Sequence, residues 1–416
     1  MRFPYVEVEF ETTGVIHDPG QAARVVDLVR SAGATDVLLL AHGWNNDITA
    51  ARRLYERLAG GLDELWSTAS VGPGRSLAVV GLLWPAVCWA DGEEVAGGGV
   101  ALADEAAALA AAIQQRIEDG AAAARLVELA ALLETSAGAR QEFLDTLRGQ
   151  LPRRAAEVDD EDPPPRMFVE GESERVYDQA GGPDLELDLG GADDATGGAA
   201  GLGVGSGGVL RRARNLLNLT TYYTMKDRAG RVGATGVGDL LVTLAAGAPQ
   251  VRLHLAGHSF GARVVAAAAN RHQSVHSVTL LQGAFSHHGF ADNVDGRGRH
   301  GSFRGVLTSG RLTGPLVITH TRNDRAVGLA YAIASRLAGH DSAGLGDASD
   351  PYGGIGSNGA LRTPEARSAG ELLDVGGRYL FTPGQVYNLR ADQFVGSHGD
   401  VTGRQVAYAL LTAMTT

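Results

Sequence analysis

A serine lies between two glycines in the segment Gly257-His258-Ser259-Phe260-Gly261. The segment directly follows the apolar residues 251–255, which predict a strand, and it precedes 262–269, which predict a helix of mostly small side chains. A sharp strand-to-helix turn strains the serine backbone and presents its hydroxyl to solvent, and the flanking glycines remove side chains that would clash there. The start of the helix adds N–H groups and a positive dipole end near the developing charge. The pattern therefore predicts that Ser259 is a nucleophile.

In this strand–turn–helix context the chain resembles the α/β-hydrolase superfamily, and in particular its serine esterases and lipases. The resemblance covers the segments of the predicted sheet, at about 1–85 and 210–416. It implies an α/β fold in which a mostly parallel central sheet is flanked by helices. A serine at the turn disfavours the branches that use aspartate there, such as haloalkane dehalogenases and typical epoxide hydrolases.

The resemblance implies two backbone donors for the oxygen that becomes negative during acyl transfer. One is the N–H of Phe260, the residue after the nucleophile. The other is the N–H of Trp44 or Gly43, in the segment Ala41-His42-Gly43-Trp44-Asn45-Asn46 that follows an apolar strand. Two pre-oriented N–H groups stabilise such a charge without reorganising. We expect His42 to be structural and not to carry a proton.

The resemblance also implies an acid and a base. Asp324, directly after the predicted strand 316–320, occupies the family's acid position, where it would hold the histidine tautomer and stabilise the imidazolium. Asp292 and Asp295 follow an earlier strand and are the alternatives, and a helix cap is the alternative role for Asp324. His398 lies between the last predicted strand and the terminal helix, and its unperturbed pKa of ~6.5 suits a general base. The order Ser, Asp, His along the chain is that of this fold.

Serine with histidine and aspartate indicates acyl transfer through an acyl-enzyme that water then hydrolyses. A small-molecule carboxylic ester is the expected substrate class. A thioesterase, an amidase and an acyltransferase would use the same triad, so they remain alternatives. A non-catalytic protein that uses the hydrolase fold as a binding scaffold is the alternative from a different functional class.

Apolar patterns in the first 85 residues alternate between strands and helices. Strands are expected at 5–10, 37–40 and 76–84, with helices at 21–32 and 49–66 between them. The alternation resumes later, with strands at 251–255, 278–281, 316–320 and 386–389 and helices at 236–246, 260–270, 329–337 and 401–414. Such alternation implies a parallel sheet with right-handed crossovers.

Residues 86–210 are predicted to be an insertion between core segments 1–85 and 211–416. After a glycine-rich loop at 92–99, apolar spacing predicts three helices, around 102–117, 126–133 and 139–147. We expect this helical unit to cover Ser259 partly as a cap, or to serve as an interaction module.

Two stretches have the composition of loops. Residues 157–208 combine an acidic run, three prolines and many glycines, so we expect loop or partly disordered linker. Residues 341–376 are rich in glycine, serine and aspartate and are likewise expected to be loop.

The composition of the chain limits the kinds of partner that it is expected to bind. The 36 Lys+Arg residues are outnumbered by 48 Asp+Glu, giving a net charge of −12, which argues against nucleic acid or an anionic membrane surface. Cys88 is the single cysteine, and His287-His288 lack ligand-type neighbours at metal spacing, so no metal and no cofactor are expected. No apolar run reaches the ~20 residues of a membrane span, and the first residues alternate like a strand, not a signal peptide. We therefore expect no stable membrane insertion and a cytoplasmic protein, with the oligomeric state open.

Overall fold

The computed structural model describes residues 2–44, 47–66, 74–86, 105–152, 163–181, 208–271, 273–324, 334, 337, 348 and 352–416. Several predicted features lie outside these residues. They are Asn45 and Asn46, Cys88, the glycine-rich loop at 92–99, and most of the linker and of the helix at 329–337.

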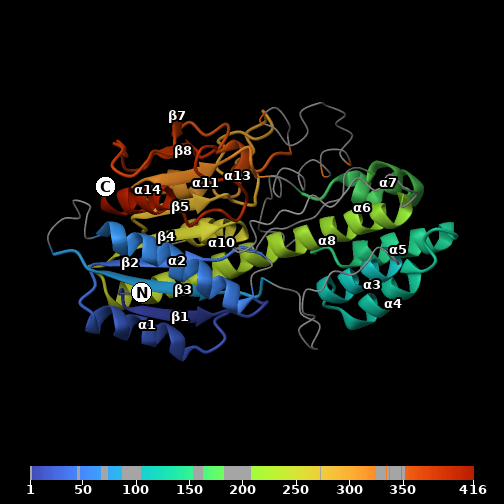
Figure 1. Ribbon diagram of the computed structural model, residues 1–416, viewed down its shortest axis with the longest axis horizontal. Coiled ribbons are helices and arrows are strands. Elements are labelled where there is room, and N and C mark those ends of the chain that lie inside the picture. The colour runs from blue at the N-terminus through green and yellow to red at the C-terminus, as the bar shows by residue number, and fades with distance from the viewer. Residues whose placement is uncertain are drawn as a thin grey trace.

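The core is an eight-stranded sheet in which every pair of neighbouring strands is parallel (Figure 1). The strand order is β1-β3-β2-β4-β5-β6-β8-β7. The strands are β1 (Tyr5–Glu9), β2 (Asp36–Ala41), β3 (Leu77–Leu83), β4 (Arg252–His258), β5 (Ser277–Leu281), β6 (Leu316–His320), β7 (Ala366–Glu371) and β8 (Val386–Arg390). The predicted α/β class and parallel sheet are confirmed.

Helices cover both faces of the sheet because its central strands are apolar on both sides. In β2, Leu38 and Leu40 belong to one apolar core, which α2 (Ile48–Trp66) and α14 (Arg404–Thr415) complete. Val37 and Leu39 belong to the other core, on the opposite face. That second core is completed by α1 (Gly20–Ser31), α9 (Gly238–Gly247) and α10 (Phe260–Ala269).

A group of helices lies beside the sheet domain (Figure 1). It contains α3 (Glu105–Arg116), α4 (Gly120–Ala130), α5 (Ala137–Gly149), α6 (Arg166–Glu170) and α7 (Ser173–Gln179). The last two correct the prediction of an unstructured linker from 157 onward. Their apolar side chains Phe168, Val176 and Tyr177 are buried, and this local packing outweighs the acidic and glycine-rich composition around them.

The long helix α8 (Gly208–Val232) was not predicted, and it crosses the expected domain boundary at 210/211. It runs from the helical group to the helices beside the sheet (Figure 1). A π-helix, η1 (Gly233–Val237), joins it to α9. The helix is buried on most sides and includes polar residues such as Asn215, Thr220 and Lys226, so it lacks the apolar stripe by which helices are recognised.

The stretch 341–376 also needs correction, because it contains β7 and the short helix α13 (Ile355–Asn358). Among the strands of the described residues, β7 pairs only with β8, and the pairing includes an irregularity between Arg367 and Gly370. One further helix, α11 (Arg304–Thr308), precedes β6. None of the helices in the described ranges has the length and apolarity needed to cross a lipid bilayer.

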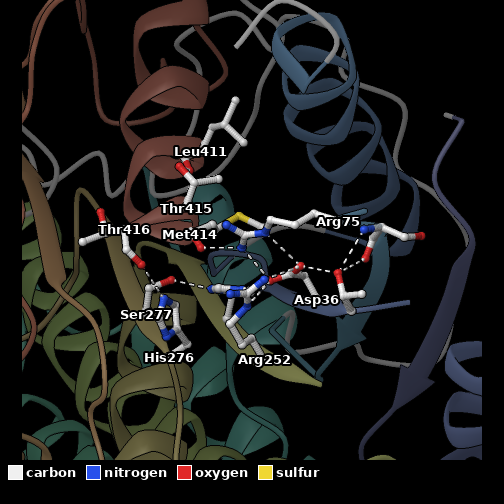
Figure 2. Close-up of polar contacts among 12 residues, drawn as sticks. Asp36, Arg75, Arg252, His276, Ser277, Leu411, Met414, Thr415 and Thr416 are labelled. Carbon is white, nitrogen blue, oxygen red and sulfur yellow. Dashed lines mark hydrogen bonds and ion pairs between the residues drawn. The ribbon is translucent and has the colours of Figure 1, made fainter. Parts of the chain in front are cut away.

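A buried charge cluster lies at the amino ends of the central strands (Figure 2). Asp36, fully buried at the start of β2, accepts hydrogen bonds from Arg75 at 2.6 Å and from Arg252 at 2.9 Å. Arg75 also donates to the carbonyl of Met414, which ties the end of α14 to the sheet. Burial alone would raise the pKa of Asp36, but its hydrogen bonds outweigh burial and hold that pKa well below its usual range.

Candidate active site

Ser259 occupies a sharp turn between β4 and α10. Its backbone has φ 57° and ψ −123°, a strained conformation for a residue with a side chain. A Cβ at Gly257 would lie 2.2 Å from the carbonyl oxygen of Gly261, and a Cβ at Gly261 would lie 2.2 Å from that of Ala41. Both positions therefore need glycine, as predicted, because the helix begins in direct contact with β4 and with the end of β2.

Neighbouring strand ends hold the turn in place. The Ser259 N–H donates to the carbonyl of Leu281 at 3.0 Å, and the Ser259 carbonyl accepts from the N–H of Ala284 at 3.0 Å. The serine is completely buried, whereas an exposed hydroxyl was expected. The residues after β2 and β5 contact the turn directly and cover the serine side chain. The close packing that goes with the strained turn therefore also buries the hydroxyl.

Asp324 and His398, which are 74 residues apart in the sequence, lie side by side at this edge of the sheet. His398 Nδ1 is 2.8 Å from Asp324 Oδ2, and both side chains are buried. The alternative acids lie elsewhere: Asp292 contacts Arg304 at 3.5 Å, and Asp295 accepts the N–H of Arg297. Among the described carboxylates it is therefore Asp324 that contacts the predicted base.

His258, the residue before Ser259, positions the loop that carries His398. Its Nε2 lies 2.9 Å from the carbonyl oxygen of His398, and the two rings are 4.9 Å apart between centroids. Burial, with the nearby charge of His398, lowers the pKa of His258 to about 3, so the ring is neutral and its Nε2–H donates. Sequence reasoning missed this contact, since the motif accepts any residue at that position.

The predicted oxyanion segment lies against the turn that carries Ser259. The ring of Trp44 packs edge-on against the ring of Phe260, with centroids 6.0 Å apart. Phe260 begins α10, so its N–H has no carbonyl one turn earlier in the helix. The structure thus brings the predicted donor residues together; their role as donors stays a prediction.

His42 fits the structural role expected for it. Its Nδ1 is 2.9 Å from the carbonyl of Gly43, and its Nε2 is 3.3 Å from the N–H of Trp84. Burial lowers the pKa of His42 to about 4 and outweighs the opposing effect of the hydrogen bond that Nδ1–H donates to the Gly43 carbonyl, so the ring is neutral at pH 7. A neutral ring with Nδ1–H donating and Nε2 accepting satisfies both contacts, which fixes the residues before Trp44.

Several buried polar atoms at this edge form no hydrogen bond to any described residue, and Ser259 Oγ, Gln282 Nε2 and His398 Nε2 are among them. Buried polar atoms are almost always bonded, so such exceptions need an explanation. Asp324 takes the Nδ1 side of the ring, which directs the basic lone pair to Nε2. The arrangement can therefore activate a hydroxyl by removing its proton at Nε2.

The remaining histidine pair does not resemble a metal site. His287 and His288 pack with ring centroids 4.1 Å apart, and His287 Nδ1 is 3.1 Å from Asn358 Nδ2. Within the described ranges, no group of three or more His, Cys, Asp or Glu side chains is arranged to hold a metal ion.

Gln282 was also missed by the sequence prediction. It is fully buried with a positive φ of 41°, directly after Leu281, whose carbonyl accepts the Ser259 N–H. Its Oε1 accepts from the Thr319 hydroxyl at 3.1 Å. Nothing in the residue type signals this strained position beside Ser259.

No protein-family model, curated protein or solved structure matches the chain.

Proposed function

We propose that this protein is a serine hydrolase of the α/β-hydrolase type that cleaves carboxylic esters. The observation that carries the proposal is the pairing of His398 with Asp324 at the sheet edge where Ser259 occupies a strained strand-to-helix turn. Both features were expected from separate parts of the sequence. A serine that merely capped α10 would explain neither the pairing nor the strain.

In the proposed mechanism His398 Nε2 removes the hydroxyl proton while Ser259 Oγ attacks the ester carbonyl carbon. The carbonyl oxygen becomes negative and is stabilised by the N–H groups of Phe260 and of Trp44 or Gly43. The tetrahedral intermediate collapses, the proton passes from Nε2 to the leaving alcohol, and an acyl-enzyme remains. Water then repeats the sequence and releases the acid. Asp324 holds the Nδ1–H tautomer and stabilises the imidazolium throughout.

His258 supports this chemistry without touching the substrate. Its hydrogen bond to the His398 carbonyl fixes the backbone of the base, and its neutral ring adds no positive charge beside the imidazolium.

Because Ser259 is fully buried, the substrate has to displace the residues that cover it. The helical group joins the sheet domain through α8, whose Tyr222 packs on Phe260 with centroids 5.3 Å apart. We also propose that this helical group caps the active site and that the protein is cytoplasmic.

The test is labelling with a small fluorophosphonate, combined with hydrolysis of p-nitrophenyl esters of increasing acyl length. Ser259→Ala should lose the label and at least ~10³-fold of turnover. Ser357→Ala is the matched control, because Ser357 Oγ is also buried without a hydrogen bond to any described residue. This control should label and turn over normally.

The same panel separates the alternatives. Faster turnover of thioesters or amides than of esters would redirect the substrate class, and transfer to an added alcohol would indicate an acyltransferase. Labelling of a serine other than Ser259, with Ser259→Ala still active, would overturn the proposal. A chain that neither labels nor hydrolyses any ester would favour the non-catalytic scaffold.

A further inference from the structure

A pocket of about 280 Å³ lies over the carboxyl ends of β1 and β3, beside the start of α2. Phe10, Leu83 and Trp84 give it an apolar lining. It lies next to the candidate active site but is distinct from it, because Ser259 does not line it, whereas His42 forms part of its wall. Ligands of parallel α/β sheets bind beyond the carboxyl ends of the strands, and the volume suits a small organic molecule.

The apolar lining is held rigidly. The three apolar side chains are each at least 95 % buried. Trp84 Nε1 donates to the carbonyl of His42 at 2.9 Å, and the two rings stack with centroids 5.7 Å apart. A preformed apolar surface of this kind binds an alkyl or aryl group with little loss of side-chain entropy.

The charge at the rim is one-sided. Glu9 and Asp47 are the acidic residues among those that line it, and none of the described lining residues is lysine or arginine. His17 also lies at the rim, with its Nδ1 3.5 Å from a carboxylate oxygen of Glu11. The buried wall adds no positive charge, because His42 is neutral at pH 7.

The N-terminus of α2 does not make the rim of the pocket attractive to anions. A helix N-terminus attracts anions through its unbonded N–H groups. Here Asp47 already accepts the N–H of Ala50 at 2.6 Å, so the chain supplies its own anion at that end. The rim therefore presents negative potential to a ligand.

We infer that this pocket binds a small organic cation, an alkyl- or arylammonium, with its apolar part against Phe10, Leu83 and Trp84 and its ammonium group near Glu9 and Asp47. This goes beyond ester hydrolysis, and it does not depend on it. The ligand would contact His42, which directly precedes the predicted oxyanion donors.

The experiment compares phenethylammonium with the neutral 2-phenylethanol, which has the same shape. Binding is measured by calorimetry and by tryptophan fluorescence, in the natural protein and in Ser259→Ala, so that the outcome does not depend on turnover. We expect the ammonium to bind about tenfold more tightly than the alcohol at low salt, with the difference shrinking as salt is added.

The variant Glu9→Gln/Asp47→Asn should reduce this preference to less than about threefold, since asparagine still caps α2. Unchanged binding of the alcohol shows that the pocket is intact in that variant. Glu11→Gln, which removes a nearby carboxylate outside the lining, should keep the full preference. Failure of both compounds to bind, equal affinity for the two, or a preference that survives the double substitution would overturn the inference.

Discussion

Two buried Asp–His pairs lie at opposite edges of the same sheet. At the amino edge His254 Nε2 is 3.0 Å from Asp36 Oδ1, and at the carboxyl edge His398 Nδ1 is 2.8 Å from Asp324 Oδ2. The amino-edge pair continues to a serine, since His254 Nδ1 is 2.8 Å from Ser277 Oγ. By hydrogen bonds alone, the amino edge contains the more complete Ser–His–Asp chain of the two.

The two Ser–His–Asp groups differ in which of their polar atoms are left without a hydrogen bond. Asp36 is neutralised by Arg75 and Arg252, and Ser277 belongs to the regular strand β5. Burial lowers the pKa of His254 to about 4, so the neutral ring donates from Nε2 to Asp36 and accepts from Ser277 at Nδ1. At the carboxyl edge Ser259 has a strained backbone, and both its hydroxyl and His398 Nε2 lack a described partner. Polar groups whose hydrogen bonds are all formed stabilise a fold, whereas a reacting group needs an atom that is free to bond the substrate.

The largest expected effect comes from the acid at the carboxyl edge. Asp324→Asn should lower kcat by up to about 10⁴-fold, because an amide donor favours the wrong tautomer of His398. Circular dichroism should show an unchanged fold. Asp292→Asn is the matched control and should leave kcat nearly normal. The opposite result would place the acid on the loop after β5.

Replacing the acid at the amino edge should cost stability and not catalysis. Asp36→Asn leaves the guanidinium groups of Arg75 and Arg252 without a counter-charge, so we expect the free energy of unfolding to fall by about 3–5 kcal/mol. Urea unfolding measures this loss. The exposed substitution Asp27→Asn should change it by less than about 0.5 kcal/mol. A loss of kcat in folded Asp36→Asn, comparable to that of Asp324→Asn, would abolish the distinction between the edges.

The contrast also shows what a sequence can predict. The strand-to-helix turn at Ser259 is local, with a strand, two glycines and a helix in one segment. Its strained geometry could therefore be predicted from the sequence pattern alone. Asp324 and His398 were predicted from the resemblance to the α/β-hydrolase superfamily, which expects the acid and the base on loops after later strands, and a parallel sheet brings such loops to one edge. Asp36 offered no such signal, because its partner Arg252 is 216 residues away. The burial of Ser259 was also missed, since it depends on packing between loops.

A smaller effect should appear on mild acidification. Burial lowers the pKa of His254 and His42 to about 4 and that of His258 to about 3. Each has a pKa of ~6.5 in the unfolded chain, so below that pH the unfolded state takes up protons that the folded state does not. Stability is therefore lost between pH ~6.5 and the folded pKa values. From pH 7 to 6 these three groups should lower the free energy of unfolding by about 2 kcal/mol. Urea titrations at the two pH values check this, and unchanged or rising stability would contradict it.

The smallest expected effect is that of the serine in the amino-edge chain. Ser277→Ala removes the hydroxyl that donates to His254 Nδ1 and leaves that buried nitrogen without its partner. We expect a loss of about 1–2 kcal/mol in the free energy of unfolding, since a buried nitrogen loses its partner. We expect no change in kcat, because Ser277 lies in the strand β5 and lacks the positive φ of Ser259. Ser259→Ala should show the reverse, with lost turnover and little change in stability. Measured side by side, the two alanine variants test whether a catalytic serine is distinguished by its hydrogen-bonded histidine or by its strained, unsaturated surroundings. If Ser277→Ala lost turnover while Ser259→Ala kept it, the chemistry would belong to the amino edge.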